Sequence, residues 1–155
     1  PTGHEIEGGW LRVRDESDKI TMSLKVVSGN KIEDQKEICL TVNSFEEAEK
    51  FLMAIGCKKK SYQENKRELW KIKDVEVTID EWPFIEPFIE IESTSKENLK
   101  EVANGLGFDY AEALFGATDI ICQKKYGIPL DAINSIPEIS FNMENPYLKI
   151  DKSKF

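Results

Sequence analysis

The sequence is poor in the residues that histidine chemistry, metal clusters and disulfide frameworks require. Its 155 residues include one histidine and three cysteines. Cys39, Cys57 and Cys122 show no Cys-x-x-Cys spacing, which favours reduced, buried thiols over a disulfide frame or a zinc site. The single His4 excludes catalysis by several histidines. It lies close to Pro1, where an initiator Met is missing, so we expect a processed, truncated or incomplete N-terminus.

Long hydrophobic runs and a surplus of positive charge are also missing. No uncharged apolar stretch approaches the ~20 residues of a membrane-spanning helix, and no basic-then-apolar leader is present. With 21 Lys and Arg against 29 Asp and Glu, the formal net charge is −8, which argues against duplex nucleic acid as a partner. The sequence therefore predicts a cytoplasmic protein that binds neither nucleic acid nor a membrane. A homodimer is left open.

What is present predicts one α+β domain over residues 1–155. Residues 1–92 carry mainly strand patterns of period 2 with one helix, and residues 93–155 are mainly helical with a final short strand. Turn signals, including Ser28-Gly29-Asn30 and Lys73-Asp74, separate the strands. The predicted strands are Leu11–Arg14, Ile20–Val27, Glu37–Val42, Arg67–Lys73, Val75–Asp80, Phe88–Glu92 and, at the end, Glu138–Asn142.

Capping signals predict the helices. Ser44 followed by Glu47 forms a capping box, and Gly56 ends that helix. Thr94 with Glu97 predicts a second capping box in the same way. Further short helices are expected over 110–115, 118–126 and 130–136, and the polar tail after residue 146 is expected to be loosely held.

Each predicted strand presents one apolar and one polar face, because successive side chains of a strand point to opposite sides. An ordinary antiparallel sheet with its apolar face under helices explains this alternation and stays open. Six or more strands, however, leave long unpaired edges unless the sheet curls and closes. A closed or nearly closed antiparallel barrel with helices packed outside would gather the polar faces in one lumen.

The polar faces carry two kinds of charge that suit a triphosphate. Arg12, Arg14 and Arg67 have forked donors that match phosphate oxygens. Acids gather on the later strands and supply the oxygen ligands that Mg²⁺ and Mn²⁺ prefer; they are Asp80, Glu90 and Glu92. Basic groups on one wall and a metal held on the other would together hold a chain of phosphates.

Five stretches of these strands occur in an order that resembles a known family. They are Leu11-Arg12-Val13-Arg14 (LRxR), Ile20-Thr21-Met22-Ser23-Leu24-Lys25 (ITxxxK), Lys36-Glu37, Lys66-Arg67-Glu68 (KRE), and residues 75–92 with Asp80 and the ExE pair Glu90 and Glu92. The set resembles the CYTH or triphosphate tunnel family, which includes class IV adenylate cyclases and thiamine triphosphatases. The resemblance spans about Gly8 to Asn145, and Leu106 to Tyr110 and Phe115 to Ala117 are similar to a helical tail of its cyclase-like bacterial branch.

The resemblance implies an eight-stranded antiparallel tunnel and a divalent-metal-dependent enzyme that cyclises ATP or hydrolyses a triphosphate. The implied substrates are ATP, thiamine triphosphate or tripolyphosphate, with Mg²⁺ or Mn²⁺ as cofactor. Carried over by position, the phosphate ligands are Arg12, Arg14, Lys25, Lys66 and Arg67; the metal ligands are Asp80, Glu90 and Glu92; and Lys25, Glu37 and Arg67 act in catalysis.

Two departures from the family keep an alternative open. The family begins with an ExExK strand, whereas Glu5-Ile6-Glu7 is followed by glycines and directly precedes the LRxR strand. Cys39 stands where many relatives carry a further acid. The alternative is a non-catalytic module that binds a nucleotide or polyphosphate without turnover.

Overall fold

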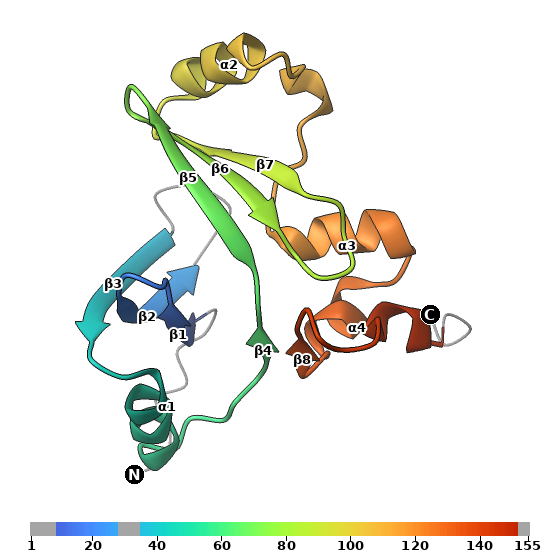
Figure 1. Cartoon of the computed structure of the whole chain (residues 1–155). Helices are drawn as coiled ribbons and strands as arrows, with labels where there is room; N and C mark the ends of the chain where they lie inside the picture. The colour runs from blue at the N-terminus through green and yellow to red at the C-terminus, as the bar shows by residue number, and fades with distance from the viewer. Residues whose placement is uncertain (1–8, 28–34, 152–155) are drawn as a thin grey trace. The chain divides into compact units, whose positions relative to one another are not determined.

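The structure is a computed structural model that describes residues 9–27 and 35–151 (Figure 1). The predicted Ser28-Gly29-Asn30 turn and the Glu5-Ile6-Glu7 segment lie outside the described residues. The chain divides into two compact units, residues 1–59 and 60–155. The single domain over residues 1–155 therefore stays a prediction.

The first unit contains a three-stranded antiparallel sheet and one helix. Strands β1 (Gly9–Asp15), β2 (Ile20–Val27) and β3 (Gln35–Val42) pair in the order β1-β2-β3. Helix α1 (Phe45–Ala54) follows β3 and contacts β1 and β2. Ser44 caps this helix as predicted, because its side chain accepts a hydrogen bond from the Glu47 amide.

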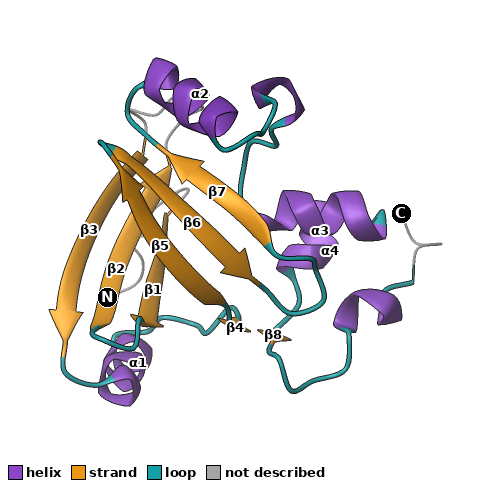
Figure 2. Ribbon diagram, turned by 45° about the horizontal axis from the view of Figure 1, so that its top comes forward, coloured by secondary structure: helices purple, strands orange, loops and turns teal. Residues whose placement is uncertain are grey.

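The second unit contains a matching antiparallel sheet. Strands β5 (Lys66–Ile72), β6 (Val75–Glu81) and β7 (Phe88–Glu92) pair in chain order (Figure 2). The Lys73-Asp74 turn joins β5 to β6 as predicted, with Lys73 at a φ of 57°. These strands agree with the predicted ones to within one residue at each end.

Short helices and one strand pair complete the second unit. Helix α2 contacts β6 and β7, and α3 contacts α4. Two short strands, β4 and β8, form a parallel pair. Strand β8 lies within the predicted strand Glu138–Asn142 and is shorter, whereas β4 was not predicted. The bounds are β4 (Tyr62–Gln63), α2 (Lys96–Gly105), η2 (Tyr110–Glu112), α3 (Thr118–Tyr126), α4 (Leu130–Asn134), β8 (Glu138–Ile139) and η3 (Pro146–Lys149).

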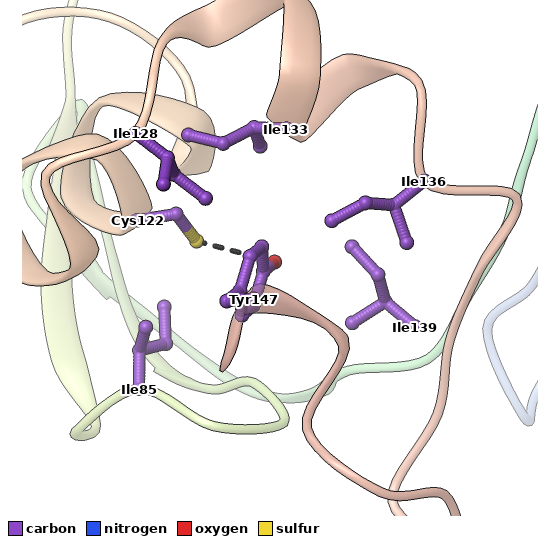
Figure 3. Close-up of a cluster of buried hydrophobic side chains, with 7 residues drawn as sticks. All are labelled: Ile85, Cys122, Ile128, Ile133, Ile136, Ile139 and Tyr147. Carbon is purple, nitrogen blue, oxygen red and sulfur yellow. Dashed lines mark hydrogen bonds between the residues drawn. The ribbon is translucent and has the colours of Figure 1, made fainter. Parts of the chain in front are cut away.

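The largest buried cluster of the described residues lies among these helices (Figure 3). Tyr147 of η3 is 2% exposed, and its hydroxyl accepts a hydrogen bond from the Cys122 thiol at 3.3 Å. The expectation of a loosely held tail after residue 146 is therefore wrong for the first described residues of this tail, because the ring of Tyr147 packs in the core. Residues 152–155 lie outside the described residues. The cluster consists of Ile85, Cys122, Ile128, Ile133, Ile136, Ile139 and Tyr147.

Two further expectations need correction. Ser95, not Thr94, caps α2: its side chain accepts from the amide of Asn98, three residues along the chain. The three thiols are free as predicted. The expectation that all three are buried is wrong, because Cys39 is exposed.

The described strands confirm an α+β fold built on antiparallel sheets. Eight strands occur in the described residues, and they form three separate hydrogen-bonded sets. The closed eight-stranded tunnel therefore stays a prediction. Over the described ranges, every helix is too short or too polar to cross a membrane.

Candidate functional site

One face of the β1–β3 sheet carries the predicted basic residues of the first unit. The register sets Arg12 opposite Ser23, and Arg14 opposite Thr21, while Lys25 lies opposite Trp10 on one side and Glu37 on the other. Because these positions alternate in step, all of them point to the same side of the sheet. We call Arg12, Arg14, Lys25 and Glu37 the basic face.

Short contacts link members of the basic face. Arg12 Nη2 donates to Glu37 Oε1 at 3.2 Å, and both side chains are 38% exposed. The Lys25 ammonium lies 5.9 Å from the centroid of the Trp10 ring. Ser23, which lies opposite Arg12 on the neighbouring strand, is 3% exposed. The cationic groups of Arg12, Arg14 and Lys25 therefore share this face with the small hydroxyl side chains of the neighbouring strand. Such a surface suits a polyanion better than an apolar ligand.

The opposite face of the same sheet is apolar and hollowed. A depression of about 360 Å³ lies beside α1 and is lined mainly by carbon atoms of Met22, Val42, Ala48 and Phe51. A smaller one of about 120 Å³ lies over the same sheet, again beside Met22. Neither hollow contains a member of the basic face, so the hollows and the predicted phosphate ligands are on different sides of the strands.

In the second unit, Arg67 is the centre of a hydrogen-bonded network. Its Nε and Nη2 donate to the two carboxylate oxygens of Asp80 at 2.6 and 2.7 Å. Nη2 also donates to Glu90 Oε2 at 2.6 Å. Thr78 Oγ1 donates to Asp80 Oδ2 at 3.0 Å. We call Arg67, Thr78, Asp80 and Glu90 the Arg67 network.

The two carboxylates of this network differ in how deeply they are buried. The Asp80 side chain is 0% exposed, whereas Glu90 is 34% and Arg67 35% exposed. Hydrogen bonding to Asp80 raises the pKa of Arg67 above its ordinary value, so the guanidinium is fixed in its charged form. Burial raises the pKa of Glu90 even though Arg67 opposes this, so the Arg67 contact compensates the Glu90 charge only in part.

The two remaining predicted residues of this unit lie outside the network. Glu92 follows Glu90 on the same face of β7, opposite Glu76. Lys66 points to the other face of β5: its ammonium lies 3.4 Å from Glu81 and 4.7 Å from the centroid of the Phe141 ring. The structure therefore brings Arg67, Asp80 and Glu90 together and does not bring Lys66 to them.

Thr78 is the member that the sequence patterns missed. It lies two residues before Asp80 on the same strand, so period 2 places both on one face, and it is 6% exposed. Its place between Glu76 and Asp80 in the alternation of β6 was the available signal.

Asp80 does not fit a divalent metal ion in this arrangement, because it is fully buried and both its oxygens accept from Arg67. Glu90 and Glu92 have the oxygen donors that Mg²⁺ and Mn²⁺ prefer, and Mg²⁺ is commonly held by one or two carboxylates together with water and substrate phosphates. Among residues 9–27 and 35–151, no three His, Cys, Asp or Glu side chains are grouped so that they could hold a metal ion.

The protein is thus an α+β protein of antiparallel sheets whose strands group arginines and lysines on a shared face. A comparison with protein families assigns residues 4–119 to the CYTH domain, and the chain belongs to the CYTH family. This confirms the family that the ordered motifs indicated.

Two solved structures share the fold. A conserved hypothetical protein from Pyrococcus furiosus is 23% identical, with 74% of this chain and 76% of that chain covered and a TM-score of 0.57. A protein from Pyrococcus horikoshii is 20% identical, with 67% and 68% covered and a TM-score of 0.58. No curated protein matches the chain. At these identities the likeness concerns the fold alone.

Proposed function

We propose that this protein binds a triphosphate and catalyses a reaction at its phosphoryl groups. The observation that carries the proposal is the grouping of Arg12, Arg14 and Lys25 on one face of the β1–β3 sheet. Membership of the CYTH family, whose members bind triphosphate substrates, supports it. The proposed substrates are ATP, thiamine triphosphate or tripolyphosphate.

The chemistry of these side chains fits binding and charge stabilisation. The arginine forks can each donate two parallel hydrogen bonds to a phosphate, and the lysine adds a compact charge. A phosphoryl transfer needs little covalent help from the protein, and catalysis comes from positioning and from neutralising charge on the phosphoryl oxygens. Neither the hydrolysis of the terminal phosphate nor the attack of a ribose hydroxyl on the α-phosphate requires a His or Cys nucleophile.

The contacts of Glu37 support an assisting role for this residue. Its carboxylate accepts from Arg12 at 3.2 Å and lies across from Lys25 in the register, so it is placed to orient one cation and to balance the charge of another. Mg²⁺ or Mn²⁺ remains part of the proposal as a requirement to be tested.

The test is product analysis by phosphorus NMR. The protein is incubated with ATP, thiamine triphosphate and tripolyphosphate, each with Mg²⁺, Mn²⁺ or EDTA. Orthophosphate would identify a triphosphatase, and pyrophosphate with a cyclic nucleotide would identify a cyclase. Metal-dependent binding without product would support the non-catalytic binding module, and no binding at all would overturn the proposal.

A matched pair of variants ties the activity to the basic face. We expect Arg12→Ala to weaken triphosphate binding about tenfold or more, since it removes a charge-assisted fork. Lys50→Ala removes the same charge from α1, where the lysine pairs with Glu47 in an exposed ion pair. Lys50→Ala should leave binding within about twofold. Equal effects of the two substitutions would show that only net charge matters.

A further inference from the structure

Arg67 donates to two carboxylates that differ in nearly every physical respect. Asp80 is fully buried, accepts two hydrogen bonds from the guanidinium and a third from Thr78, and has no exposed surface. Glu90 is 34% exposed and accepts one hydrogen bond, from Nη2. Separating Arg67 from Asp80 is costly, because this carboxylate accepts three hydrogen bonds and is shielded from water. Separating Arg67 from Glu90 costs less, because Glu90 accepts one hydrogen bond and is partly exposed.

We propose that Asp80 and Thr78 are positioning residues that fix the Arg67 fork, and that Glu90 occupies the place on this fork that a phosphate oxygen takes. The inference rests on the proposed function. It assigns Asp80 a different role from the metal ligand that the family resemblance implied.

The geometry of the guanidinium supports this division. Asp80 takes the edge formed by Nε and Nη2, which leaves the end formed by Nη1 and the second N–H of Nη2. Glu90 accepts from Nη2, and Nη1 donates to no residue in the described part of the chain. An anion that displaces Glu90 would thus meet two parallel N–H groups whose direction Asp80 has already set, which lowers the entropic cost of binding.

Thr78 contributes by holding the carboxylate that holds the arginine. Its hydroxyl donates to Asp80 Oδ2, the oxygen that also accepts from Nη2, and the threonine is 6% exposed. A buried carboxylate needs several donors to remain charged in place. Loss of the Thr78 hydroxyl should therefore loosen the fork without removing any charge.

The two carboxylates should respond in opposite directions when each is neutralised. Asp80→Asn removes a negative charge, which by simple electrostatics would favour an anion, but it also breaks the paired acceptor of the fork, and we expect binding of tripolyphosphate to weaken about tenfold. Glu90→Gln removes the negative charge that competes for Nη2, and we expect binding to strengthen by up to about fivefold, the fold-change that matches an exposed ion pair.

A charge-matched control separates competition from net charge. Glu76 lies on the same face of the same sheet, and its carboxylate pairs with Lys71 at 2.8 Å instead of with Arg67. Glu76→Gln therefore makes the same change in charge without freeing the fork. We expect its effect on tripolyphosphate binding to be clearly smaller than that of Glu90→Gln.

The experiment is a calorimetric titration of the full chain with tripolyphosphate, once in EDTA and once with Mg²⁺, for the wild type and the three variants, each checked for folding by circular dichroism. A spectroscopic readout accompanies it: the Arg67 Nε–H resonance in nitrogen-15 NMR. It should be protected from exchange in the wild type and in Glu90→Gln, with or without tripolyphosphate, and lost in Asp80→Asn. If Asp80→Asn does not fold, Thr78→Val replaces it, with a weakening of about twofold to fivefold expected.

The outcomes distinguish this inference from the proposed function. Wild-type binding combined with a folded Asp80→Asn variant that binds as tightly overturns the positioning role alone. Equal effects of Glu90→Gln and Glu76→Gln overturn the displacement of Glu90 alone. No binding of tripolyphosphate by the wild type or any variant, either in EDTA or with Mg²⁺, overturns the proposed function and this inference with it.

Discussion

Tyr147 is a buried polar side chain whose chemistry is set by its surroundings. Burial raises the pKa of its phenol well above the ordinary value of 10.0, and burial also raises the pKa of the neighbouring Cys122 thiol above 9.0. Both groups are neutral when protonated, so the folded protein keeps protons that the unfolded chain has lost at alkaline pH. Their contribution to stability is complete below about pH 9 and is lost as the pH rises through the raised pKa values.

The variant Tyr147→Phe tests this pH dependence. At pH 7 we expect a loss of about 0.5–1.5 kcal/mol, because the hydrogen bond from the Cys122 thiol disappears. Above about pH 10 the wild type should lose stability more steeply than the variant, which has no phenol to ionise. Urea unfolding at about pH 7 and pH 10.5 measures both differences. Parallel loss of stability in the two proteins would contradict the assignment.

Neighbouring residues Lys66 and Arg67 should differ sharply in phosphate binding. Lys66 lies on the other face of β5, beside Glu81 and Phe141, whereas Arg67 donates to Asp80. We expect Lys66→Met to leave tripolyphosphate affinity within about twofold, and Arg67→Lys to weaken it about tenfold, because lysine keeps the charge and lacks the fork. Calorimetric titration measures both. If Lys66→Met weakened tripolyphosphate binding by more than about twofold, Lys66 would have to be counted among the phosphate ligands.

Residue type and period 2 were enough to predict which charged residues share a face. They grouped Arg12 with Arg14, and Arg67 with Asp80, because alternation fixes the side of the sheet once the strand is known. The same alternation places Lys66 on the opposite side from Arg67, and Lys66 entered the predicted site only because the family motif names adjacent residues. Residue type and period 2 could not show that Asp80 is fully buried, which depends on packing over the whole sheet.

At the scale of elements, the start of α2 is a direct test of capping. Ser93, Thr94 and Ser95 offer three successive hydroxyl groups, and Ser95 makes the hydrogen bond to the Asn98 amide. We expect Ser95→Ala to lower the free energy of unfolding by about 1 kcal/mol and Thr94→Ala, an exposed control one residue away, to change it by less than about 0.5 kcal/mol. Urea unfolding compares them. The reverse order would restore Thr94 as the cap.

The positions of most strands and helices could be predicted from the sequence, whereas the cap of α2 and the β4–β8 pairing could not. Strand and helix positions followed from alternation and apolar stripes, which depend on sequence over many residues. The cap depended on which of three similar residues has extended backbone angles, a local choice that the sequence does not fix. The parallel pair β4–β8 joins Tyr62 to Glu138 across most of the second unit, and the sequence predicted a strand at Glu138 but not its two-residue partner β4, which is too short to show a pattern.

At the scale of the whole chain, buried apolar side chains are divided unequally between the two units. Of the described residues in the first unit, Ala48 is the one buried hydrophobic side chain, while both buried clusters belong to the second unit. Ile38 and Leu40 of β3 are 64% and 53% exposed. Because apolar burial is the main stabilising contribution, the first unit should open more readily than the second.

Hydrogen exchange measured by mass spectrometry tests this difference on matched strands. Strands β2 and β6 are each the central strand of a three-stranded antiparallel sheet, so both have hydrogen-bonded neighbours on both sides. We expect amides of β2 to exchange about tenfold or more faster than those of β6. Equal protection of the two strands would instead support a single cooperative domain over residues 1–155.

The same measurement connects stability with function. If the basic face binds tripolyphosphate, the ligand stabilises the closed form of the first unit, by about 2.7 kcal/mol at a concentration 100 times the Kd. Protection of β2 should then rise toward that of β6, and Arg12→Ala should abolish the rise at the same ligand concentration. An increase confined to β6 would place the ligand on the second unit alone, since a ligand protects only the amides whose opening it opposes.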